Sequence, residues 1–391
     1  MTLATSYTSE STQSFGLSLL AQLTRGPENV CISPLSIDLC LQLALYGAKG
    51  STAAEMLKTT AISAGNRDVL ADDACRLIDS LNSSQASSWE GPGASVKVLL
   101  ANSAWVHEQV KLDRQYVHGL HEKYKAECAN LNFADGSALE TINAWVAQHT
   151  ENRIPTIIDN LSPANLLVLV NCAYFKARWG HPFEVADTKL RDFYVNGGEA
   201  VPVTTMRHDI TSLDYFQDEE VQIARLQYID DRFGMYIVLP ARNTNLSNVI
   251  ANFTLDKWKT LLSKLRPHAG VFSLPKFKVE SRMELAPVLQ NLGIREAFTR
   301  QADFSNILDS AQEMPPFFCI DQVIHKTFIE IDEEGTEAAA ATAIAMWGAG
   351  IPKPPPPFEM IVDRPFLYVI ADDATGTVLF LGTVNDPRNR P

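Results

Sequence analysis

The chain has 391 residues, of which 46% are hydrophobic, and its 33 Lys and Arg against 46 Asp and Glu give a formal net charge of −13. Such a chain can bury a large core, and its acidic balance argues against nucleic acid or an anionic membrane as a partner. No run reaches the roughly 18 apolar residues of a membrane span. The longest low-complexity run is a proline tract at 354–357 close to the C-terminus, so we expect one domain, 1–391.

The first part of the chain is predicted to be mainly helical. Ser14–Leu23 has apolar residues at helical spacing, and Ser33-Pro34 is typical of an N-cap followed by proline at the first helical position. Thr52 with Glu55 matches a capping box. Three further helices are expected at Asp68–Leu81, Asp113–Ala126 and Ala138–Thr150.

Strands follow and then dominate. Two are predicted at Val96–Val106 and Leu166–Phe175, and the second is almost continuously apolar, as expected for a strand covered on both faces. Beyond Val201 the predicted strands are Val221–Gln227, Met235–Leu239, Val271–Phe277, Phe366–Ile370 and Val378–Val384, the last two joined by a turn at Ala371–Gly376. Helices first and sheets later predict an α+β fold.

Nothing in the sequence predicts an enzyme or a cofactor. There is no Gly-x-Ser-x-Gly, His-Glu-x-x-His or Cys-x-x-Cys motif and no complete phosphate loop. His118 and His121 are three residues apart, but no third metal ligand follows nearby, so we interpret them as surface residues of a helix and expect no metal site.

The N-terminus and the cysteines bear on the compartment. Met1–Glu10 has neither a basic start nor an apolar stretch long enough for a secretion signal, so we expect a cytoplasmic protein, or a secreted one if a signal peptide has been removed or export is leaderless. The six cysteines lack close-spaced pairs, which favours reduced thiols.

The most informative segment is Glu333–Ala345. Its four consecutive alanines favour a helix, but the apolar stripe that would dock a helix is missing, and Gly350 and a proline run follow. At a period of two residues, one face carries only small side chains, at Thr336, Ala338, Ala340 and Thr342. The segment could therefore enter a sheet as a strand.

This pattern resembles the hinge and reactive-centre loop of the serpins, the serine protease inhibitor superfamily. Four other segments are similar to serpin motifs in the family's order: Ser33–Ile37, Asn143–Val146, Val170–Trp179 and Asp363–Tyr368. The resemblance implies about nine helices, three sheets and an exposed reactive-centre loop at about 333–362.

The resemblance also implies a mechanism, suicide-substrate inhibition, and its residues. A protease would cleave the loop and be trapped as an acyl-enzyme when the hinge inserts into the central sheet. The implied hinge is Glu333, Glu334, Gly335, Thr336, Glu337, Ala338, Ala339, Ala340, Ala341 and Thr342. Ser33, Ser36, Asn171 and His325 would form a buried hydrogen-bond network that can re-pair when the strands separate, which lowers the cost of opening the sheet. The loop base would involve Trp179, Lys276 and Glu333, with an ion pair between the last two.

The predicted position of the scissile bond depends on the end of the loop from which residues are counted, because the span from Gly335 to Phe366 is about five residues longer than is typical of the family. Counting from the hinge gives Ala349-Gly350, whereas counting back from the C-terminal motif gives a bond near Pro354. We adopt the hinge count, since 333–349 is the usual length for the inserting segment. Ala349 favours an elastase-like protease, and the alternative specificity residues Met346 and Trp347 favour a chymotrypsin-like one.

The implied partner is a serine protease in a covalent complex, with cysteine proteases as a second class, and we expect a monomer. No heparin site is expected, because the acidic helix 68–81 carries only Arg76 as an internal cation. Two alternatives stay open: a non-inhibitory serpin that acts in storage, transport or as a chaperone, and a plain binding module with a flexible loop.

Overall fold

The computed structural model describes residues 7–60, 67–84, 96–195, 198–336 and 357–388. Within these ranges the chain forms α-helices and two hydrogen-bonded sheets, which confirms the predicted α+β class. The α-helices are α1 (Tyr7–Leu23), α2 (Pro34–Gly47), α3 (Gly50–Thr59), α4 (Arg67–Ser84), α5 (Arg114–Tyr124), α6 (Ser137–His149), α7 (Leu246–Ala251), α8 (Leu255–Lys264) and α9 (Ala286–Leu292). The short 3-10 helices are η1 (Val185–Asp187) and η2 (Glu296–Phe298).

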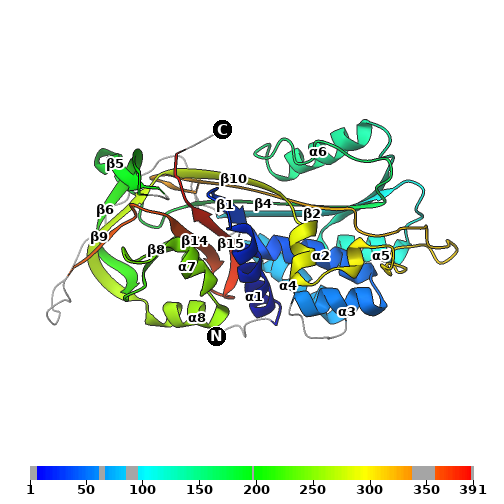
Figure 1. Ribbon diagram of the computed structural model, residues 1–391, viewed down its shortest axis with the longest axis horizontal. Coiled ribbons are helices and arrows are strands. Elements are labelled where there is room, and N and C mark those ends of the chain that lie inside the picture. The colour runs from blue at the N-terminus through cyan, green and yellow to red at the C-terminus, as the bar shows by residue number, and fades with distance from the viewer. Residues whose placement is uncertain (1–6, 61–66, 85–95, 196–197, 337–356, 389–391) are drawn as a thin grey trace.

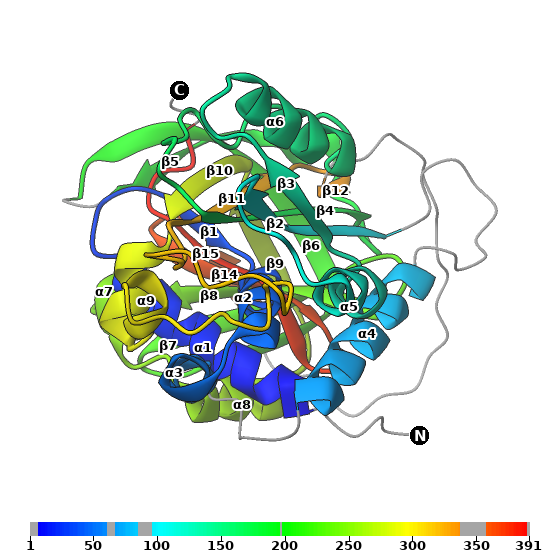
Figure 2. The same ribbon diagram turned by 90° about the vertical axis from the view of Figure 1, so that its right-hand side faces the viewer.

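A six-stranded sheet runs along the long axis of the molecule (Figure 1). Its strands, in spatial order, are β10 (Phe277–Glu284), β11 (Gln322–Ile331), β12 (Gly335–Thr336), β4 (Leu167–Arg178), β2 (Lys97–His107) and β3 (Glu127–Leu131). Helix α6 lies on one face of this sheet, and α2 lies on the other (Figures 1 and 2).

A nine-stranded sheet forms the other end of the molecule. Its strands, in order, are β1 (Val30–Ile32), β15 (Thr377–Val384), β14 (Phe366–Asp372), β8 (Phe233–Pro240), β7 (Val221–Gln227), β6 (Ala200–Gln217), β9 (Arg266–Pro275) and β13 (Phe358–Ile361), with β5 (Lys189–Tyr194) beside β6. Strand β6 pairs with β5 from Ala200 to Thr205, with β9 from Thr205 to Tyr215 and with β7 from Asp214 to Gln217. This long strand joins two of the three sheets implied by the resemblance into one continuous ladder.

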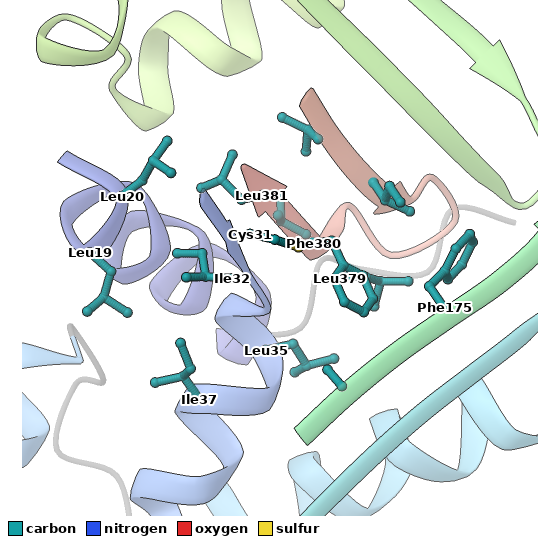
Figure 3. Close-up of a cluster of buried hydrophobic side chains, with 14 of the residues drawn as sticks. Leu19, Leu20, Cys31, Ile32, Leu35, Ile37, Phe175, Leu379, Phe380 and Leu381 are labelled. Carbon is teal, nitrogen blue, oxygen red and sulfur yellow. The ribbon is translucent and has the colours of Figure 1, made fainter. Parts of the chain in front are cut away.

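Strand β4 separates two hydrophobic clusters, because successive side chains point to opposite faces. Ala173, Phe175 and Ala177 belong to the large cluster that also contains α2 and the C-terminal hairpin. Phe175 meets Phe380 of β15 edge to face at 6.1 Å (Figure 3). Cys172 and Tyr174 belong to the smaller cluster beneath α6.

Some local predictions are confirmed and others are wrong. Ser33 caps α2, because its side chain accepts a hydrogen bond from Ser36 N at 3.3 Å and Pro34 follows. The predicted capping box is wrong: α3 begins at Gly50, which places Thr52 inside the helix. Glu55 instead accepts the backbone N–H groups of two residues at the start of η2, at 2.8 and 2.7 Å.

The predicted strand Val271–Phe277 is confirmed as part of β9 up to Pro275, but its predicted end is wrong, because it crosses a boundary between sheets. Strand β9 ends at Pro275 in one sheet and β10 begins at Phe277 in the other. Lys276 lies between them, and its backbone N donates to Thr204 O at 2.8 Å. Helices α7, α8 and α9 interrupt the region predicted to be β-rich.

All six cysteines are free, and Cys31, Cys40 and Cys172 are buried. Among the helices described, none is long and apolar enough to cross a membrane.

Candidate functional site: the seam between β4 and β11

Strands β4 and β11 are parallel neighbours in the six-stranded sheet. They pair directly over seven positions, from Val168 opposite Gln322 to Tyr174 opposite Phe328. We call this stretch the seam. C-terminal to the seam, β4 and β11 are separated by β12, which pairs with Ala177 and Arg178 of β4 and with Ile331 of β11. Gly335 and Thr336 of the hinge therefore already form a short strand between β4 and β11.

A tight turn leads from β11 into β12. The Asp332 carboxylate accepts the backbone N–H groups of Glu334 and Gly335 at 2.9 and 3.2 Å. Gly335 has a φ of +152°, and a Cβ at this position would lie 2.2 Å from Ala177 O. A side chain here would push the strand out of the sheet, so the turn requires glycine.

The three loop-base residues implied by the resemblance lie together. Lys276 Nζ is 2.8 Å from Glu333 Oε2. Burial raises the pKa of Glu333, but the hydrogen bond and charge of Lys276 together with other hydrogen bonds outweigh burial, so the pKa is lowered. Trp179 holds the same turn, because its backbone N donates to Glu334 O at 2.8 Å and its indole Nε1 donates to Asp332 O at 3.0 Å.

Tyr228 completes this cluster, and sequence reasoning missed it. Its ring stacks on Trp179 at 4.7 Å with an angle of 13° between the planes. Its hydroxyl lies 2.9 Å from Thr336 Oγ1. Both Tyr228 and Thr336 are fully buried. Thr336, the first residue on the small-residue face of the hinge, is thus already in the core. No local pattern in the sequence indicates that Tyr228 is its partner.

The polar network of Ser33, Ser36, Asn171 and His325 is centred on the Asn171–His325 pair of the seam, and its members are fully buried. His325 Nε2 accepts the backbone N–H of Ser33 at 3.1 Å. Because a backbone N–H can only donate, the proton of the neutral ring is on Nδ1, which donates to Asn171 Oδ1. Asn171 Nδ2 donates to Ser36 O at 2.9 Å and also contacts Ser36 Oγ. Burial lowers the pKa of His325 to about 3, so the ring stays neutral at physiological pH.

One bond of this network crosses the seam. His325 lies directly opposite Asn171 in the β4–β11 register, so separating the two strands breaks their side-chain hydrogen bond. Asn102 of β2 is a further member that sequence reasoning missed; it lies opposite Asn171 and accepts from its Nδ2. The only indication in the sequence is a polar residue inside a largely apolar strand.

Several predicted residues lie outside the described part of the chain. These are the hinge residues Glu337, Ala338, Ala339, Ala340, Ala341 and Thr342, the specificity residues Met346 and Trp347, and the reactive bond Ala349-Gly350. Within the described residues, no group of three or more His, Cys, Asp or Glu side chains could hold a metal ion. His121 is exposed and contacts Glu122 at 3.2 Å.

Comparison with known proteins agrees with this geometry. The family model described as "Serpin (serine protease inhibitor)" matches residues 10–387. The chain is a serpin. It is similar to "Serine protease inhibitor 42Dd" of Drosophila melanogaster, with 33% identity over 368 residues that cover 92% of each chain. Among solved structures it is similar to the native state of the thermophilic serpin tengpin, with a TM-score of 0.84, 28% identity and coverage of 96% and 93% of the two chains.

A third similarity shows the serpin fold alone. Human thyroxine-binding globulin, solved in complex with its hormone, has a TM-score of 0.85, 24% identity and coverage of 98% and 99% of the two chains. The serpin fold therefore does not by itself distinguish a protease inhibitor from a protein that binds a small molecule.

Proposed function

We propose that this serpin is a suicide-substrate inhibitor of serine proteases that inserts its hinge into the seam after the loop is cleaved. The observation that carries the proposal is β12. Its two residues already pair with both β4 and β11, and Thr336 is buried against Tyr228. As the seam opens, insertion would then extend an existing strand and would not have to nucleate a new one.

The register of β12 determines what each further hinge residue would meet. Continuing both antiparallel pairings places Ala338 opposite Phe175 and Ile329, and Ala340 opposite Ala173 and Thr327. These positions face the large core cluster, where Phe175 is fully buried. Small side chains at 338 and 340 are therefore what this face can accept without expelling Phe175.

The same register brings Thr342 opposite both Asn171 and His325. Opening the seam breaks the hydrogen bond between those two side chains, and a threonine hydroxyl between them can donate one bond and accept another. The network would thus be satisfied again after insertion, which lowers the cost of separating the strands.

The other face of the hinge accepts its charge. Glu337 would lie opposite Lys176 of β4 and Glu330 of β11, two residues that are only partly buried. Since Lys176 supplies an opposite charge close to water, Glu337 would enter the sheet without becoming a buried unpaired carboxylate.

We propose Ala349-Gly350 as the reactive bond and an elastase-like enzyme as the target, with a chymotrypsin-like enzyme that cleaves after Met346 or Trp347 as the second choice. An active-site serine would attack the carbonyl carbon of Ala349 and release the amino group of Gly350, leaving an acyl-enzyme. The serpin acts in this scheme as a monomeric substrate and has no catalytic group of its own.

Denaturing gel electrophoresis after mixing with pancreatic elastase, chymotrypsin or trypsin tests the proposal. We expect a covalent complex with elastase and only weak reaction with trypsin, since Lys353 is followed by proline. Cleavage without a covalent complex but with a large rise in melting temperature would instead indicate a non-inhibitory serpin whose hinge still inserts. Cleavage without stabilisation would indicate a serpin whose hinge does not insert.

A further inference from the structure

An open cavity of about 450 Å³ lies where β6 and β7 diverge. The two strands pair only from Asp214 opposite Arg225 to the end of β6, so N-terminal to Asp214 this edge of β6 no longer pairs with β7, while its opposite edge is paired with β9 as far as Tyr215. The β6–β9 register shifts between Ile210 and Leu213, so the backbone here bulges away from a regular ladder. The cavity is lined by residues of both strands, and Trp179 and His181, which follow β4, line it as well.

The charged side chains that line the cavity are already paired. Asp209 is 2.9 Å from Arg207. Arg225 is 2.5 Å from Asp373 and 3.7 Å from Asp214. Binding a charged ligand would require one of these pairs to break or an extra charge to lose its hydration, so the lining favours an uncharged molecule.

Two imidazoles supply the hydrogen-bonding groups that remain. His181 and His208 line the cavity, and within the described ranges of the chain neither imidazole ring makes a hydrogen bond. Burial and the neighbouring His181 lower the pKa of His208, so its ring is neutral at physiological pH and offers one N–H donor and one nitrogen acceptor. Apolar surface comes from Trp179, Leu213 and Leu226. This combination suits a flat aromatic ring that carries a hydroxyl group.

The cavity shares a wall with the hinge. Trp179 lines it and also stacks on Tyr228, whose hydroxyl contacts Thr336. Gly180, next to Trp179, donates to Gln227 O at 2.8 Å, and Gln227 lines the cavity as well. A molecule seated here would hold Trp179, at the end of β4, against the nine-stranded sheet.

We propose that this cavity binds an uncharged aromatic alcohol, and that its occupancy slows insertion of the hinge into the seam. A hydroxyl can donate to one imidazole nitrogen and accept from the other ring, while the aromatic body covers the apolar wall. Insertion requires β4 and β11 to move apart, and a ligand that fixes the end of β4 resists that movement. The effect on insertion rests on the proposed inhibitory function, whereas the binding site does not.

The binding experiment uses 2-naphthol, an uncharged fluorescent aromatic alcohol, titrated into the full-length native protein. The ligand control is 2-methoxynaphthalene, which has the same rings but cannot donate a hydrogen bond. We expect saturable binding of one 2-naphthol that is at least about tenfold weaker for the methoxy compound, as expected for the loss of one good hydrogen bond.

Variants locate the site. His208→Ala and, separately, the exposed His181→Ala should each weaken 2-naphthol binding several-fold. His118→Ala, which removes an exposed histidine from α5, should leave it unchanged. No saturable binding, equal affinity for the two naphthalenes, or equal affinity in the wild type and both cavity variants would overturn the assignment.

The coupling to the hinge is tested with the rate of covalent complex formation with elastase, measured with and without saturating 2-naphthol. Elastase activity on a small chromogenic substrate corrects for any direct effect on the protease. We expect trapping to slow several-fold in the wild type and to be unaffected in a His181→Ala, His208→Ala double variant. An unchanged wild-type rate refutes the coupling. If no covalent complex forms without ligand, the proposed function fails, and the titration still decides the binding site.

Discussion

Replacing Thr336 with arginine separates loop cleavage from loop insertion. Thr336 is the first inward-facing hinge residue, it has 0% exposure, and its hydroxyl lies 2.9 Å from that of the buried Tyr228. An arginine here would have to leave the sheet or bury a cation in an aromatic pocket formed by Tyr228 and Trp179. The loop would still be accessible to the protease, because the substitution lies thirteen residues before the proposed reactive bond, at Ala349.

The magnitude follows from the cost of insertion. In the uncleaved protein Thr336 is already buried against Tyr228, so an arginine first displaces β12 from the sheet. Insertion of the cleaved loop must then bury an unpaired charge, at a cost of about 3 kcal/mol or more. A barrier raised by about 3 kcal/mol slows insertion by roughly a hundredfold, whereas hydrolysis of the acyl-enzyme is unchanged. Most of the acyl-enzyme would then be hydrolysed before the hinge inserts, and the protease would be released instead of trapped.

The assay is the stoichiometry of inhibition, obtained by titrating a fixed amount of elastase with serpin, with a denaturing gel to distinguish complex from cleaved serpin. We expect Thr336→Arg to be cleaved without forming a complex. Thr336→Ser is the matched control, because it keeps the hydroxyl and should retain trapping. If Thr336→Arg traps elastase with undiminished stoichiometry, the interpretation of β12 as the start of insertion is wrong.

Three further predictions concern stability, network repair and the cleavage site. Burial raises the pKa of Asp38 from 3.8 to about 6, so ionisation of this carboxyl destabilises the fold as pH rises from 3.8 to about 6. Asp38→Asn should increase the free energy of unfolding by about 3 kcal/mol at pH 7 and by little at pH 4, and identical urea-denaturation profiles across this range would contradict this. Thr342→Val should lower the melting temperature of the cleaved, inserted serpin more than that of the native serpin, because about 1–3 kcal/mol is lost where the hydroxyl would meet His325; equal shifts in calorimetry would argue against the extrapolated register. Mass spectrometry of the C-terminal peptide released by elastase should find Gly350 at its start, and a start at or beyond Pro354 would mean that the reactive bond lies closer to the C-terminus.

The features that the sequence determined by itself are local. The alternation of small side chains from Thr336 onward follows from the period of a strand, and the cap of α2 follows from Ser33 and Pro34 standing side by side. The α+β class follows from the change of period along the chain. The seam network and the loop base came from resemblance to a family, because no local pattern relates residues as distant as Asn171 and His325, which are 154 positions apart.

Only the tertiary structure decided which groups meet. Tyr228 is 108 positions from Thr336, and Glu55 satisfies backbone donors about 240 positions away and not those of its own helix. The cavity beside Trp179 lies where the pairing of β6 with β7 ends while its opposite edge is still paired with β9, a choice of partners that the composition of β6 does not express. Hydrophobic periodicity records which face of a segment is buried. What covers that face depends on packing among all the segments together. The same packing places Gly335 and Thr336 between β4 and β11, while those two strands stay paired with each other along the seam.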